Sequence, residues 1–238
     1  MMSNPGLPKD DIDKVLSIAR EIIESGAVLN IRKLIRVATR ELRFTRKYLS
    51  RILDFLLGNR ILVEGTTFTR NTVLENGFRR IIMEMVERER VVNFSFLREE
   101  LGKTCSQEIF SSGQLLWHLN LLLKFKHLKR VKLGKKTLFA CSSLGDGFIK
   151  ASFLLRDPII VDLASILQEN KEITKAELVK AVKSNRDKVY YRLKVLQNEG
   201  FISTTPGSKS EQVSMSAILH EALLHLLREQ ERGKEEKS

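Results

Sequence analysis

Cysteine is scarce in this sequence of 238 residues, which contains only Cys105 and Cys141. The two residues lack the close spacing that is typical of a metal site or a redox motif. Free and mostly buried thiols in a reducing cytoplasm are the simple interpretation.

Long apolar runs are missing as well. No run approaches the roughly 20 residues that a helix needs to span a bilayer. The first residues, MMSNPGLPKDDIDK, lack the apolar core of a signal peptide. We therefore expect no membrane span and a cytoplasmic location.

Patterns typical of catalysis are also absent. The sequence has no glycine-rich phosphate loop, no acid pair and no nucleophile motif. Of the four histidines, His220 and His225 are five residues apart, which is a poor helical pair, and no cysteine is nearby in sequence. Satisfied or solvated histidines are favoured over a metal site. The sequence predicts a non-catalytic protein with no cofactor and no metal.

Acidic residues are missing from residues 109–145, a stretch with seven basic side chains: Lys124, Lys126, Lys129, Arg130, Lys132, Lys135 and Lys136. The whole chain has a formal charge of +12, divided as +5, +6 and +1 over residues 1–71, 72–150 and 151–238. Such a balance favours nucleic acid or an anionic membrane surface as partner. A lysine-rich soluble protein without such a partner is the alternative.

Residues 112–141 predict a helix followed by a basic β-hairpin. Leu115, Leu119, Leu122 and Phe125 recur at helical spacing and share one face. Residues 128–133 then alternate apolar and basic side chains, Gly134-Lys135 supplies a turn, and 137–141 returns as a second strand. This is the sequence form of a recognition helix and a wing.

Two other segments repeat this pattern at offsets of 66 and 74 residues. Five apolar positions agree in all three copies: Leu115, Leu119, Leu121, Leu122 and Leu128; Leu49, Leu53, Phe55, Leu56 and Leu62; Val189, Leu193, Val195, Leu196 and Ile202. The fold class expected is therefore mainly α with small β-hairpin wings, an α+β arrangement. We predict three tandem winged-helix modules, 1–71, 72–150 and 151–238, the last with a C-terminal helix over 216–230.

Helix caps and connections can also be predicted. Asn30, Thr45 and Thr174 are expected to cap helices that start directly after them. Gly58-Asn59 and Gly200 are expected to end helices. Residues 142–150 are expected to form a linker or a short strand continuation.

The second copy resembles the archaeal and bacterial winged-helix transcriptional regulators related to the arsenical-resistance repressors. The matching residues are Trp117-His118-Leu119, Leu122 and Leu133-Gly134-Lys135. The third copy matches through Tyr191-Arg192-Leu193, Leu196 and Glu199-Gly200-Phe201-Ile202, and the first through apolar spacing only. The resemblance implies the winged-helix fold strongly and the ligand weakly.

In such DNA-binding proteins the third helix enters the major groove and the wing contacts the backbone. The resemblance thus implies duplex DNA as partner. The DNA-contact candidates are Arg43, Arg46, Lys47, Arg51, Lys129, Arg130, Lys132, Lys135, Lys136, Arg186, Lys188, Tyr191 and Lys194. A DNA-binding transcriptional regulator is the function expected first.

Apolar outward positions favour a protein partner instead. Leu116, Trp117 and Leu123 lie on the outward face of the second copy's third helix, where groove reading requires polar side chains. Leu219, Leu223, Leu226 and Leu227 form a stripe on the C-terminal helix that is expected to pair two subunits, unless the helix folds back on the third copy. A tandem winged-helix assembly subunit, of the kind found in endosomal-sorting complexes or among RNA polymerase accessory subunits, is the alternative function.

Overall fold

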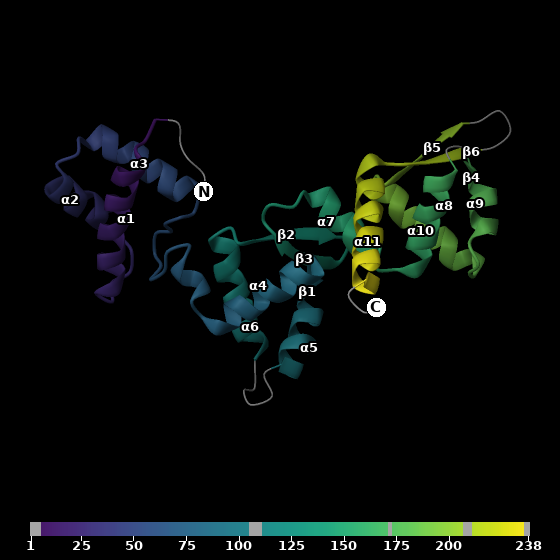
Figure 1. Cartoon of the computed structure of the whole chain (residues 1–238), viewed down its shortest axis with the longest axis horizontal. Coiled ribbons are helices and arrows are strands. Elements are labelled where there is room, and N and C mark those ends of the chain that lie inside the picture. The colour runs from purple at the N-terminus through teal and green to yellow at the C-terminus, as the bar shows by residue number, and fades with distance from the viewer. Residues whose placement is uncertain (1–5, 105–110, 171–172, 207–210, 236–238) are drawn as a thin grey trace. The chain divides into compact units, whose positions relative to one another are not determined.

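A computed structural model describes residues 6–104, 111–170, 173–206 and 211–235 (Figure 1). Over these residues the chain is mainly helical and has two small three-stranded antiparallel sheets. The expected class, helices with small sheets, is confirmed.

The chain divides into two compact units. Unit 1 contains Met1–Arg88 and Ser95–Lys129, and unit 2 contains Glu89–Phe94 and Arg130–Ser238. The predicted boundaries after residues 71 and 150 fall inside these units, and the predicted module 72–150 is divided between them. The division into three modules therefore stays a prediction.

Unit 1 begins with three helices, α1 (Lys9–Glu24), α2 (Ile31–Leu42) and α3 (Arg46–Gly58). The predicted caps are confirmed, because Asn30 accepts from the Lys33 N–H and Thr45 from the Tyr48 N–H. Leucine, isoleucine, valine and alanine side chains from all three helices form one buried cluster. In place of a first wing, the described chain has one isolated bridge between Leu62 and Thr69.

The rest of unit 1 is formed mainly by η1 (Thr72–Leu74), α4 (Gly77–Glu89), α5 (Phe94–Thr104) and α6 (Ser112–Lys124). Ser111 caps α6 in a reciprocal capping box with Gln114. The four predicted apolar positions Leu115, Leu119, Leu122 and Phe125 are all fully buried.

The first sheet has the order β1-β3-β2, from β1 (Val91–Asn93), β2 (Leu128–Leu133) and β3 (Lys136–Cys141). The predicted hairpin is confirmed, whereas β1 was not expected because it has only three residues. The prediction for 142–150 is wrong, since α7 (Asp146–Leu154) begins there. Gly145 and Gly147 flank its first residue and obscure the helical signal, but burial of Ile149 and Ala151 fixes the helix.

The second sheet has the order β4-β6-β5 and lies among helices of unit 2. Its elements and the surrounding helices are α8 (Pro158–Glu169), β4 (Ile173–Thr174), α9 (Lys175–Ala181), α10 (Arg186–Asn198), β5 (Ile202–Pro206), β6 (Glu211–Met215) and α11 (Ala217–Glu235). The expected Thr174 cap is confirmed as a capping box with Glu177. The expected wing tip after Pro206 lies outside the described residues.

One element order occurs twice. Helix, strand, helix, helix, strand, strand describes both α4-β1-α5-α6-β2-β3 and α8-β4-α9-α10-β5-β6. In both series the first strand pairs with the last, antiparallel. The five apolar positions shared by the three sequence copies also have one burial pattern, with the third position half-buried and the other four buried in every copy.

The third helix of each copy ends in the same hydrogen-bonded turn. The N–H groups of Ile61, His127 and Phe201 each donate to the carbonyl five residues earlier, at 2.8–2.9 Å. The residue before each of these, Arg60, Lys126 or Gly200, has a left-handed backbone, with φ of 56°, 54° and 74°. This is the Schellman ending, in which glycine is the favoured residue.

Helix α11 packs inside unit 2. It contacts α7 and α8 and is the yellow helix of Figure 1. Leu219 and Leu223 are both 0% exposed, and Leu226 and Leu227 pack against the same core. The expectation that this stripe pairs two subunits is therefore corrected for Leu219 and Leu223, because their apolar surface is already buried within the chain.

Candidate nucleic-acid interface

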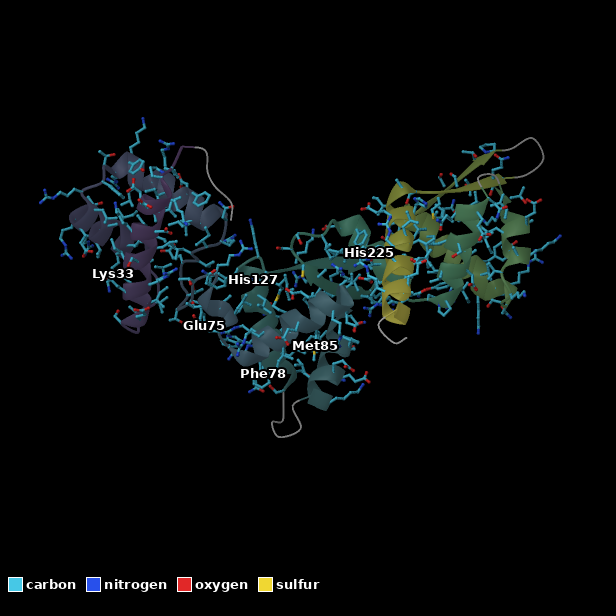
Figure 2. All side chains as sticks on the ribbon, in the orientation of Figure 1. Lys33, Glu75, Phe78, Met85, His127 and His225 are labelled. Carbon is cyan, nitrogen blue, oxygen red and sulfur yellow. The ribbon has the colours of Figure 1, made fainter. Side chains whose placement is uncertain are left out.

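The helix pair α2–α3 presents a dense basic surface in unit 1. Eight Arg or Lys side chains of this pair and its connecting turn are exposed: Arg32, Lys33, Arg36, Arg40, Arg43, Arg46, Lys47 and Arg51. Lys33 is labelled on α2 in Figure 2. Among the described residues, only Arg40 has a carboxylate partner, Glu41, at 3.3 Å. The four predicted contacts of the first copy all belong to this surface.

Four of the eight charges of this surface oppose a helix dipole. The first turns of α2 and α3 contain Arg32, Lys33, Arg46 and Lys47 and no acidic residue. The N-terminus of a helix carries about half a positive charge, so each cation there costs roughly 0.3–1 kcal/mol. At α2 the Glu64 carboxylate already accepts from the Ile31 N–H at 3.1 Å, and Asn30 and Thr45 cap the two helices. A bound anion relieves the repulsion that remains among the exposed cations.

The outward face of α6 is apolar, as the sequence predicts. Leu116 is 50% and Trp117 is 52% exposed, and Leu123 is half-buried. Beneath Trp117 lies the buried side chain of Arg79, whose guanidinium carbon is 5.7 Å from the Trp117 ring and 4.9 Å from the Phe68 ring. Arg79 also donates from Nε to the Val73 carbonyl. The Arg79 guanidinium thus lies within cation–π distance of the exposed indole.

Two histidines of unit 1, the buried His118 and the half-buried His127, are poorly suited to carry charge. Desolvation by burial and then the positive charge of Arg79 lower the pKa of His118. Burial also lowers the pKa of His127, against the opposing effect of a 2.8 Å hydrogen bond between its Nε2 and the Arg70 carbonyl. Both rings are therefore held in the neutral form more strongly than an exposed histidine.

The β2–β3 hairpin carries the predicted wing residues. Arg130, Lys132, Lys135 and Lys136 are exposed, and Lys129 is half-buried. Lys132 Nζ donates to Thr137 Oγ1 at 2.8 Å, and Lys136 Nζ lies 4.9 Å from the centre of the Phe153 ring. Neither Lys135 nor Lys136 has an ion pair within the part of the chain that the structure describes.

Helix α10 carries the predicted contacts of the third copy. Arg186, Lys188, Tyr191 and Lys194 are all exposed, and Asn185 caps the helix. Arg186 donates to the Tyr190 hydroxyl at 3.4 Å, and this hydrogen bond raises the pKa of Arg186. Tyr191 is 64% exposed, which is unusual for a large aromatic side chain.

The structure brings three of these predicted contacts together in unit 2. A groove of about 840 Å³ is lined by the hairpin turn with Lys135 and Lys136, by the end of α7, and by one side of α10 with Tyr191. Arg156, Asp157, Arg192, Asn198 and Glu199 complete its polar lining. Lys188 and Lys194 do not line it.

Sequence patterns did not indicate this groove. Arg156 follows α7, which was expected to be a linker, and Phe153 lies within that helix. Arg156 donates to the Val91 carbonyl at 2.7 Å and pairs with Glu89 at 3.4 Å, so it joins α7 to β1. The apolar run FIKASFLL, residues 148–155, could have predicted α7 if Gly147 had been allowed inside a helix.

No helix of the described chain is both long and apolar enough to cross a membrane. Within the same residues, no group of three or more His, Cys, Asp and Glu side chains is arranged to hold a metal ion.

No protein-family model and no curated protein matches this chain. Among solved structures, the chain is similar to the bacterial selenocysteine-specific elongation factor EF-Sec, with 13% sequence identity and a TM-score of 0.31. The match covers 87% of this chain and 29% of that chain, so this chain spans less than a third of the length of EF-Sec. A likeness this weak supports no conclusion about fold or function.

Proposed function

We propose that the chain is a non-catalytic DNA-binding regulator built from three tandem winged-helix modules, 1–71, 72–150 and 151–238. The element order that occurs twice, with its matching strand pairing, supports two of these modules. The shared burial pattern and the shared Schellman endings support a first module of similar structure, although its wing is reduced to one bridge.

The observation that carries the proposal is the basic surface of α2–α3. Seven exposed cations have no carboxylate partner among the described residues, and four of them lie where the helix dipole is also positive. A phosphate backbone would neutralise these seven cations, which no carboxylate of the described chain does. A three-residue connection between α2 and α3 is also what a helix-turn-helix requires.

A salt series tests this function. Fluorescence polarisation with a random 16-base-pair duplex should show log-linear weakening with salt, with a slope of about −0.9 per phosphate contacted. Arg46→Ala with Lys47→Ala should reduce that slope by about 2, similarly for every duplex sequence, because phosphate contacts carry no base information.

The matched control removes two exposed cations from α1, through Lys9→Ala with Arg20→Ala. It should retain the slope of the unmodified chain. Absence of binding at low salt would contradict the proposal. So would an affinity that does not change with salt, or equal effects of the two double variants.

A second function is favoured by one observation, the exposed Leu116 and Trp117 on α6. In the proposed second module this face is too apolar for a solvated groove-reading helix, and it fits the interface of an assembly subunit. In the same salt series, Leu116→Ser with Trp117→Ser distinguishes the two roles. Unchanged DNA binding assigns the face to a protein partner, and weakened binding assigns it to DNA.

A further inference from the structure

We propose that the groove between the β2–β3 turn and α10 binds a short stretch of single-stranded nucleic acid. The inference rests on the proposed nucleic-acid function, but it concerns a surface separate from α2–α3 and a different form of the ligand. It assigns Tyr191 to an unpaired base and Lys135 and Lys136 to the backbone of the strand.

The size of the groove favours a single strand over a duplex. The hairpin turn and α10 line the same space of about 840 Å³, together with Phe153 and Leu154 of α7. A helix that reads duplex DNA must enter a major groove about 12 Å wide and 8.5 Å deep, with room for both strands around it. The space here has the size of a small-ligand pocket, roughly 300–1,000 Å³. A single strand with splayed bases is narrow enough to enter.

The charges that line the groove select an anion. Its two acids are already neutralised, since Asp157 Oδ2 accepts from Arg192 Nε at 2.9 Å and Glu199 Oε2 accepts from Lys150 Nζ at 2.8 Å. Asp157 Oδ1 also accepts from the Ile159 N–H at 3.0 Å, so both of its oxygens are engaged. Lys135 and Lys136 have no such carboxylate among the described residues. The groove therefore presents two uncompensated cations along the hairpin turn.

An aromatic ring lines the same groove as these cations. The Tyr191 ring is 64% exposed at the edge of the groove, and the Arg192 guanidinium carbon is 5.4 Å from its centre. Val195 and Asn198 follow one and two turns later and line the same groove. Nucleic-acid bases stack on exposed aromatic rings regardless of sequence, and the Asn198 amide offers hydrogen bonds to a base edge.

Basic side chains from the hairpin turn and an aromatic ring from α10 in one groove are the two parts of a single-strand site. An acidic peptide would satisfy the lysines, but it has no base to stack on Tyr191. The aromatic ring is therefore the feature that separates a nucleic-acid ligand from any other polyanion.

The full chain should be titrated with fluorescein-labelled hexathymidylate, hexauridylate and the 16-base-pair duplex. Tyr191→Ala should lower the ratio of single-strand to duplex affinity roughly 5- to 150-fold, the loss expected for one stacked base. Tyr191→Phe keeps the ring and should restore the ratio. The comparison of the two hexamers shows whether the strand is DNA or RNA.

Lys135→Ala with Lys136→Ala should weaken hexamer binding and reduce its salt slope by about 0.7 per lysine. Arg228→Ala with Arg232→Ala removes the same charge from exposed positions of α11 and should leave hexamer binding unchanged. Melting temperatures of the Tyr191 and lysine variants should match the unmodified chain, because these side chains are exposed.

The outcomes separate this inference from the proposed function. Duplex binding without hexamer binding overturns the groove proposal alone, and hexamer binding without duplex binding overturns the duplex proposal alone. An unchanged affinity ratio for Tyr191→Ala, or displacement of the hexamer by hexaglutamate at equal concentration, also overturns the groove proposal. A ratio that falls with Tyr191→Ala and returns with Tyr191→Phe supports it.

Discussion

Replacing Arg60 by glycine should stabilise unit 1. Arg60 has a φ of 56° at the Schellman ending of α3, where its N–H donates to the Leu57 carbonyl at 3.0 Å. A left-handed backbone costs a residue with a Cβ roughly 1–2 kcal/mol. Glycine avoids this cost but loses about 0.5–1 kcal/mol more backbone entropy on folding. The net gain for Arg60→Gly is therefore about 0.5–1 kcal/mol, since the exposed Arg60 side chain makes no hydrogen bond or ion pair among the described residues.

The reverse substitution, of glycine by a residue with a Cβ, tests the same reasoning in unit 2. Gly200 occupies the equivalent position after α10, with a φ of 74°, and an added Cβ there would meet no atom within 4 Å. Gly200→Ala should therefore lose about 0.5–1 kcal/mol through backbone strain alone. Lys126 is a poorer test, because its Nζ donates to the Gly58 carbonyl at 3.2 Å.

Urea unfolding measures both effects. Trp117 is the single tryptophan of the sequence and lies in unit 1, so its emission follows that unit, while circular dichroism follows the whole chain. With a slope of about 2 kcal/mol/M, the midpoint should rise by about 0.3–0.5 M for Arg60→Gly and fall by a similar amount for Gly200→Ala. A lower midpoint for Arg60→Gly, or no change for Gly200→Ala, would refute the equivalence of the two helix endings.

Two further predictions concern stability. Leu223→Glu should destabilise unit 2 by more than about 2 kcal/mol, because Leu223 is fully buried, and should not give a folded monomer. The control is Arg228→Glu at an exposed position. A melting temperature of Leu223→Glu no lower than that of the control would contradict this prediction. Folding lowers the pKa of His118 and of His127 below the ordinary value of 6.5. The stability that depends on their neutral rings is therefore present above pH 6.5 and is lost as the pH falls through the folded-state pKa. The melting temperature followed by circular dichroism should thus fall between pH 7.5 and 5.5, and by less in His127→Gln; an equal fall in both proteins would count against His127.

Local signals were sufficient for many elements of this fold, but not for β1 or α7. Asn30, Thr45 and Thr174 cap the helices that follow them, because a side-chain oxygen three residues before a free N–H is a property of the sequence alone. The spacing of Leu115, Leu119 and Leu122 likewise predicted their burial, since it aligns them on one helical face. The basic character of residues 124–136 was also evident, because charge is a property of the sequence.

Tertiary structure decided which of these elements meet. The stripe of α11 is equally apolar whether it covers a second subunit or α7 and α8, so its spacing could not distinguish the two. Lys135 and Tyr191 were both predicted as contacts, but their common groove depends on α7, a helix whose glycines concealed it. Sequence periodicity reports which face of an element is buried, and it is silent about the partner that buries it, because that partner is chosen by packing between segments far apart in the chain.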